Sequence, residues 1–180
     1  KMLYFWKKEF KSFMKRILFL GLILFLPACE PDDICSDSTQ TTSPLVIEFF
    51  NIENLSDTKT VPGLFAIGVD AEGNEVVVDG EVVSSRNKIA LPLDVSQNQT
   101  QFKLYQNYSV IDGVVQGNPD TITITYNSES VYVSKACGYK NVFTIQSFEI
   151  QSDLDLWMIV SSVAINEVAN ENETHVEILH

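Results

Sequence analysis

The chain is poor in histidine, the residue on which much acid–base and metal chemistry depends. Only His175 and His180 occur among its 180 residues, and both lie in a C-terminal tail that we expect to be frayed. A catalytic triad needs a histidine beside its nucleophile, and a metal site needs several suitably spaced ligands. We therefore expect a protein that is not an enzyme and that holds no metal or other cofactor.

Basic residues are also scarce once residues 1–28 are set aside. Those first residues carry six of the 12 Lys and Arg residues but only one of the 24 Asp and Glu residues. Residues 29–180 therefore hold six basic and 23 acidic residues, a net charge of −17. A surface this acidic repels nucleic-acid phosphates and anionic headgroups. We exclude nucleic acid as a partner and expect membrane attachment to depend on a lipid rather than on basic side chains.

The N-terminal apolar run is too short to cross a bilayer, which takes about 20 residues. It spans Ile17 to Phe25, follows the basic pair Lys15-Arg16 and leads into Leu26-Pro27-Ala28-Cys29. This order is typical of a bacterial lipoprotein precursor, although proline stands where Ala or Ser is usual. We predict a signal peptide over residues 1–28 and a diacylglyceryl thioether on Cys29.

Two other interpretations of this start remain open. An ordinary secretory signal could be cleaved nearby, which would leave Cys29 to form a disulfide. Residues 1–13 add a second basic cluster before Met14, although the signal peptide is already complete from Met14 onward. We interpret residues 1–13 either as lying before the true start of translation or as a longer basic N-terminal region of the signal peptide.

Residues 29–43 are predicted to be a lipidated acidic tether. Glu30-Pro31-Asp32-Asp33 combines a proline with three carboxylates, which favours an extended, solvated segment. The segment also resembles the acidic signal that sends many Bacteroidota lipoproteins to the outer face of the outer membrane. We expect an outer-membrane lipoprotein of the cell envelope, with display at the surface favoured over the periplasmic face.

The two remaining cysteines, Cys35 and Cys137, form an even pair. Free thiols seldom persist in the oxidising compartment that a signal peptide implies. We predict a disulfide between them, which would close a loop of about 100 residues and contribute up to about 4.7 kcal/mol. Two free thiols or a metal pair are the alternatives.

Residues 44–180 have the pattern of a single all-β domain. Apolar and polar residues alternate with a period of two, most clearly over Thr121–Tyr126, and turn residues recur at short intervals. We predict an antiparallel β-sandwich, immunoglobulin-like or related. The same pattern predicts several local features. These are an edge or ending strand at Pro92, a turn at 117–120 whose last residue, Asp120, leads into the next strand, and a bulge near Ser147. Further along we expect a central strand over 157–165, a mobile segment over 166–174 and a last strand over 176–179.

Three sets of residues are candidates for a functional site. Tyr105, Tyr108 and Tyr139 lie near predicted loops and could stack on sugar rings, although packing is the simpler explanation. Asp153 and Asp155 could be the acid pair of a glycosidase, although two acids in so acidic a chain are usually solvated. The segment 70–75 has oxygens at alternate positions as in a calcium loop, but a hairpin turn fits its Asp, Gly and Asn better.

Several short motifs resemble those of a Bacteroidota lipoprotein family that carries a domain of unknown function. They are Cys29 followed by Asp32-Asp33-Ile34-Cys35, then Thr42-Ser43-Pro44-Leu45, Leu91-Pro92-Leu93, and Ala136-Cys137-Gly138-Tyr139 before Val142-Phe143. The resemblance covers residues 29–150 and leaves the role of 151–180 open. It implies membrane attachment, pairing of the two cysteine motifs, and an outer-membrane barrel protein as a partner, but no activity.

We therefore expect a membrane-anchored, non-catalytic binding or scaffolding module that uses a loop surface or an edge strand. A surface glycan-binding lipoprotein is the alternative, and an acid-pair glycoside hydrolase is a third hypothesis. The ligand-binding residues, the partner and the oligomeric state cannot be predicted from the sequence.

Overall fold

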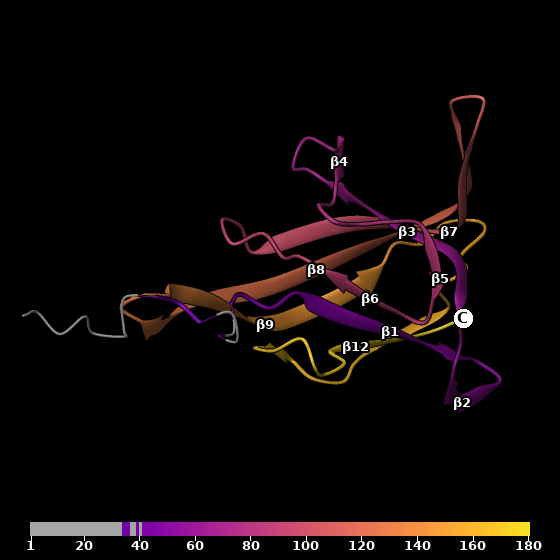
Figure 1. Ribbon diagram of the computed structural model, residues 1–180. Coiled ribbons are helices and arrows are strands. Elements are labelled where there is room, and N and C mark those ends of the chain that lie inside the picture. The colour runs from indigo at the N-terminus through magenta and orange to yellow at the C-terminus, as the bar shows by residue number, and fades with distance from the viewer. Residues whose placement is uncertain (1–33, 37–38, 40) are drawn as a thin grey trace, which may run out of the picture.

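Figure 1 shows the computed structural model of the chain, which describes residues 34–36, 39 and 41–180. The predicted signal peptide, Cys29 and the acidic segment 30–33 lie outside the described residues. The described part is all-β and contains no helix, as the period-two pattern predicts. Its strands are β1 (Leu45–Asn51), β2 (Asn54–Thr58), β3 (Val61–Val69), β4 (Glu75–Val77), β5 (Ser84–Arg86), β6 (Lys88–Leu91), β7 (Gln99–Ile111), β8 (Val114–Ser134), β9 (Gly138–Ile150), β10 (Val160–Val163), β11 (Glu167–Val168) and β12 (Val176–Leu179).

The strands form two sheets. The first has the order β10-β12-β1-β2, and β6 also pairs with β1. The second has the order β11-β9-β8-β7-β3-β4, and β5 also pairs with β3. The paired strands run antiparallel with one exception, because β1 and β12 are parallel.

The core lies between the two sheets, as in the predicted β-sandwich. Alternate residues of β1 and β8 point into it, and Leu45, Ile47, Ile122 and Ile124 are fully buried. Both sheets contribute to one continuous cluster of buried apolar residues. The alternation in the sequence therefore marks the buried faces of the strands correctly.

Several local predictions are confirmed. Strand β6 ends at Leu91, directly before Pro92, and pairs with β1. Asp70–Asn74 forms the turn of the β3–β4 hairpin. In the β8–β9 pair, Thr125 lies opposite Ser147 but Tyr126 lies opposite Ile145, so a bulge occurs where the phase of the apolar residues changes.

The predicted central strand over 157–165 is wrong. Only Val160–Val163 forms a strand, β10, and it lies at the edge of the first sheet, where it pairs with β12. The backbone N–H groups of Trp157 and Met158 donate instead to the carboxylate of Asp120 on β8. The Asp120 side chain thus satisfies the hydrogen-bonding capacity of these two N–H groups. Trp157 and Met158 therefore need no neighbouring strand to accept from them.

In the C-terminal part, the predicted last strand is confirmed, but the expected mobile segment and the frayed tail are wrong. The segment 166–174 contains β11, which pairs with β9 and buries Val168 completely. The predicted strand over 176–179 is present, but it is not frayed, because β12 lies between β10 and β1. His175 and His180, which flank it, are both buried.

The predicted turn at 117–120 lies inside β8 instead. The register between β7 and β8 shifts between Gln106 and Ser109, opposite Gly117, so this stretch is a bulge in a continuous ladder. A Cβ on Gly117 would lie 2.8 Å from the Gln106 carbonyl oxygen, and its φ is +118°. Glycine is required by this close approach of two strands, rather than by a chain reversal.

Candidate functional site

One end of the second sheet is joined covalently to the N-terminal segment. The predicted disulfide between Cys35 and Cys137 is present, with the two Cα atoms 4.9 Å apart. Cys137 lies in the turn that connects β8 with β9, and its backbone N–H donates to Ser134 Oγ at 3.0 Å. A second link follows at once, because the Asn141 N–H donates to Thr42 Oγ1 at 2.9 Å. The N-terminal segment is therefore held against the β8–β9 hairpin.

The opposite end of β8 carries a projecting hairpin. The end of β7 and the start of β8 form a two-stranded ribbon that leaves the body of the sandwich, at the upper right of Figure 1. Its turn is Asp112-Gly113, where both φ angles are positive (51° and 78°), as a type I′ turn requires. Four aliphatic side chains on this ribbon are each about half exposed: Val110, Ile111, Val114 and Val115. We call these four residues the apolar hairpin.

The apolar hairpin is apolar on both faces. Val110 lies opposite Val115 and Ile111 lies opposite Val114, and neighbouring pairs on a ribbon point to opposite faces. In the sequence these residues have the composition of a core strand. Their exposure follows from the bulge before them, which carries the ribbon away from the partner sheet.

Close backbone packing determines the position of the bulge between β7 and β8. Asn107 adopts a positive φ of 57°, and its Cα lies 3.1 Å from the position of a Cβ on Gly63 of β3. Gly117 approaches the same part of β7 from the other side. Two glycines therefore let three strands meet closely at the base of the ribbon.

The three tyrosines proposed as a sugar-binding patch do not come together. Tyr105 is buried and packs edge-on against Tyr108, with ring centroids 5.2 Å apart, and Tyr108 in turn lies against Phe65. Tyr139 pairs instead with Tyr132 at the other end of the sheet. The residues of β8 that lie opposite Tyr105 and Tyr139 are 13 positions apart, or about 40 Å along the strand.

Asp120 is a buried carboxylate whose role the sequence did not reveal. It is fully buried in β8, and its Oδ2 accepts the N–H groups of Trp157 at 3.0 Å and Met158 at 2.8 Å. Its Oδ1 has no hydrogen-bond partner. Burial raises the pKa of Asp120 to about 6, and these two N–H donors limit the rise. The residue holds the segment before β10 against the second sheet.

Asp153 and Asp155 lie close enough to Asp120 for their negative charges to raise the pKa of Asp120 further. Both side chains are exposed, and the Asp155 N–H donates to Asp153 Oδ1 at 3.1 Å. They form a local turn on the surface. The residues described by the structure contain no group of three or more His, Cys, Asp or Glu side chains that could hold a metal ion.

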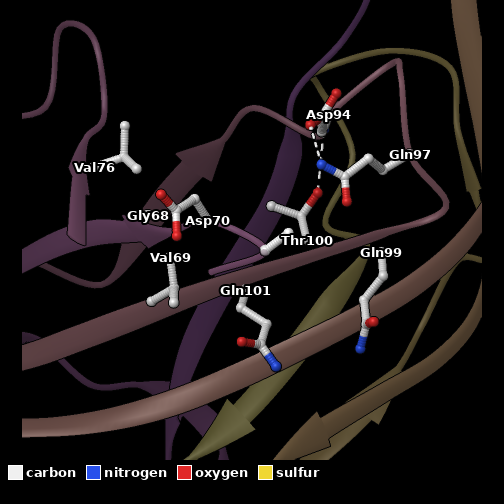
Figure 2. Close-up of a pocket in the computed structure, with 10 residues that line it drawn as sticks. Gly68, Val69, Asp70, Val76, Asp94, Gln97, Gln99, Thr100 and Gln101 are labelled. Carbon is white, nitrogen blue, oxygen red and sulfur yellow. Dashed lines mark hydrogen bonds between the residues drawn. The ribbon is translucent and has the colours of Figure 1, made fainter. Parts of the chain in front are cut away.

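A cavity of about 530 Å³, lined by both polar and apolar residues, lies between the β3–β4 hairpin and the start of β7 (Figure 2). Its carboxylates are already engaged: Asp94 accepts from Ser96 and Gln97, and Asp70 accepts from the side-chain amide and the backbone N–H of Asn74 and from the N–H of Glu72. These hydrogen bonds lower the pKa of Asp70 and of Asp94 below their usual value. The oxygens of Asp70 therefore close the hairpin turn that we favoured over a calcium loop.

Taken together, these features define a disulfide-linked β-sandwich with an apolar hairpin at one end. In the part of the chain that the structure describes, no helix is long and apolar enough to span a membrane. The chain belongs to a family of unknown function, DUF6452, whose model matches residues 64–180. No curated protein and no solved structure matches the chain.

The extent of the family match corrects our expectation of residues 29–150. The match begins inside β3 and continues to the last residue, so it includes the segment 151–180. The structure gives the physical reason, since β12 lies inside the first sheet and β11 extends the second. Residues 151–180 thus belong both to the family match and to the sandwich of this chain.

Proposed function

We propose that this protein is a non-catalytic binding module, held at the outer membrane by lipid on Cys29, and that the apolar hairpin binds a protein partner. The exposure of four aliphatic side chains on a ribbon that leaves the sandwich carries this proposal. Contiguous exposed apolar side chains are uncommon on monomeric proteins and often mark interaction sites. An outer-membrane barrel protein is the partner that we favour, through a part of it that extends beyond the bilayer.

The position of the hairpin supports this role. The anchor would lie six residues before Cys35, which is bonded to the turn at one end of β8, whereas the apolar hairpin lies at the other end. Strand β8 has 21 residues and would reach about 65 Å if it were straight. With the proposed anchor on Cys29, the hairpin would lie on the side away from the membrane, where a partner could reach it.

The charge distribution supports an apolar mode of binding. Residues 29–180 carry a net charge of −17, but the ribbon from Ser109 to Gly117 contains Asp112 as its one charged residue. Binding through such a surface depends on burial of apolar area rather than on ion pairs. We expect the complex to persist at ionic strengths that dissociate electrostatic encounters.

We propose no catalytic role for Asp153 and Asp155, because both are exposed and they form a surface turn. The glycan-binding alternative loses its proposed patch, since Tyr139 lies far from Tyr105 and Tyr108. The apolar hairpin is the stronger candidate surface.

Site-specific photocrosslinking in intact cell envelopes tests the proposal. A photoreactive residue at Ile111 should yield one defined adduct, whereas the same residue at Val77 on β4, an equally apolar and more exposed position, should not. Changing Val114 to Ser in the Ile111 probe should reduce the adduct. Equal labelling from both positions, or none from Ile111, would show that the hairpin is not the binding surface.

The lipid anchor has its own test. Mass spectrometry of the mature N-terminal peptide should find the fatty acyl mass on Cys29, and Cys29→Ala should release the protein from the membrane fraction. A mature chain without acyl mass would refute the anchor and leave the hairpin proposal to be judged by the crosslinking.

A further inference from the structure

We infer that the tip of the β8–β9 hairpin rests on the lipid bilayer and that Tyr132 and Tyr139 lie in its headgroup region. This inference rests on the proposed lipidation of Cys29. It adds a second contact to the membrane and thereby fixes the orientation of the sandwich.

The length of the tether limits how far the tip can lie from the membrane. Cys35 follows Cys29 by six residues, which span at most about 21 Å when fully extended. The disulfide then leads directly to Cys137 in the β8–β9 turn. Tyr139 lies close by, because it lines a cavity of about 230 Å³ together with both cysteines. The tip is therefore the part of the sandwich nearest to the anchor.

The side chains at the tip suit a membrane interface. Tyr132 and Tyr139 are 58% and 69% exposed, lie opposite one another in the ladder and pack edge-to-face with centroids 5.4 Å apart. Ile34, next to Cys35, is 83% exposed. Tyrosine is enriched at headgroup level, where its ring contacts apolar chains while its hydroxyl stays hydrated. In water, by contrast, this exposed pair has no evident role in the packing of the sandwich.

The charge at the tip also suits this partner. The run Ser130–Phe148 contains no acidic residue, although residues 29–180 hold 23. The same run includes Lys135 and Lys140, two of the six basic residues of that region, and Lys135 is exposed in the turn. This run itself therefore adds no carboxylate repulsion at anionic lipid. Glu129 and Glu149 flank it along the two strands, and the N-terminal segment that is bonded to the tip carries Glu30, Asp32, Asp33 and Asp37. A bilayer fits both the charge and the short tether, and we favour it over a protein as the occupant of this surface.

Depth-dependent tryptophan quenching in vesicles tests the inference. The natural tryptophan of the mature chain, Trp157, is buried and gives a constant background. The purified acylated protein would carry Tyr139→Trp or, as the matched control at the opposite end, Val115→Trp. Vesicles of phosphatidylcholine with phosphatidylglycerol would contain lipids brominated near the headgroup. We expect about twofold stronger quenching of the Tyr139→Trp signal than of the Val115→Trp signal.

Two further measurements separate the possible failures. Flotation of the same vesicles reports the anchor, so protein that fails to float refutes the lipid attachment. Protein that floats but shows equal quenching at both positions refutes the contact of the tip alone. Tyr132→Trp offers an independent probe at the tip. Quenching of this tryptophan by acrylamide, which stays in the aqueous phase, should fall by about half after vesicles are added. Unchanged access to acrylamide would also overturn the inference.

The disulfide provides an internal control for the geometry. The double variant Cys35→Ala and Cys137→Ala keeps Cys29 and its lipid but removes the covalent link to the tip. We expect it to float as before and to lose most of the headgroup quenching of Tyr139→Trp. Full quenching without the disulfide would show that the short tether does not position the tip.

Discussion

The imidazole Nδ1 of His175 accepts a hydrogen bond at 3.0 Å from the backbone N–H of Val46, 129 residues earlier in the chain. The backbone N–H of His175 donates in return to the Val46 carbonyl oxygen at 3.0 Å. These two bonds continue the parallel pairing of β12 with β1, which joins the two ends of the domain. His175 is thus a structural residue in the core, and burial lowers its pKa.

We predict that His175→Ala destabilises the protein by about 2–4 kcal/mol, because the change leaves the buried Val46 N–H without an acceptor and opens a cavity. His175→Asn is the matched control, since its side-chain oxygen can accept the same hydrogen bond. Urea unfolding should show a clearly smaller loss for Asn than for Ala. Equal losses would mean that the hydrogen bond is unimportant and that the shape of the imidazole matters.

The buried histidines and Asp120 should affect stability in opposite directions as the pH changes. Burial lowers the pKa of His175 and His180, so below about pH 6.5 the unfolded chain binds protons that the folded chain does not, and stability falls. Burial raises the pKa of Asp120 from 3.8 to about 6, so the folded chain binds the extra proton in that window. Protonation of Asp120 therefore raises the free energy of unfolding by at most about 3 kcal/mol as the pH falls from 6 to below 4.

Asp120→Asn separates these contributions. The amide oxygen can still accept the N–H groups of Trp157 and Met158, but it does not titrate. We expect the unfolding free energy of this variant to fall more steeply below pH 6 than that of the original protein, because the compensating gain is lost. The variant should also be at least as stable at pH 8, where Asp120 is a buried charge. Parallel pH profiles for the two proteins would contradict the raised pKa.

Much of the fold was predictable because the signal was local. The alternation over Thr121–Tyr126 reports a strand with one buried face, and Asp70–Asn74 carries the residues of a tight turn. The disulfide between Cys35 and Cys137 was predictable because only these two cysteines remain beside Cys29 and because an oxidising compartment was expected. Each of these features depends on residues close together in the sequence or on a single pair.

The features that were missed depend on partners far away in the sequence. The segment before β10 is held by Asp120, 37 residues earlier, and no local pattern signals this. The C-terminal tail is ordered by β1, at the other end of the domain. The apolar hairpin was missed because its four aliphatic residues have the composition of a buried strand. Whether such residues are exposed depends on where the opposing sheet ends, which the local sequence does not indicate.

Gly117 offers a test of the bulge that positions the apolar hairpin. We predict that Gly117→Ala costs about 2–4 kcal/mol, because its Cβ would lie 2.8 Å from the Gln106 carbonyl oxygen at a φ of +118°. Gly113→Ala is the matched control in the hairpin turn, where φ is also positive but no atom lies within 4 Å. It should cost only about 1 kcal/mol. Thermal unfolding that ranks the two variants in the opposite order would show that β7 and β8 are not tightly packed there.

The last prediction concerns the stability that the disulfide provides. Cys35 and Cys137 are 102 residues apart, and closing so long a loop restricts the unfolded chain by up to about 4.7 kcal/mol. We expect Cys35→Ser with Cys137→Ser to lower the unfolding free energy by about 2–4 kcal/mol, as measured by urea unfolding of the mature chain. Reduction of the original protein should produce the same loss, since it removes the same link, and it should have no effect on the double variant. If reduction destabilised both proteins equally, the loss could not be assigned to this bond.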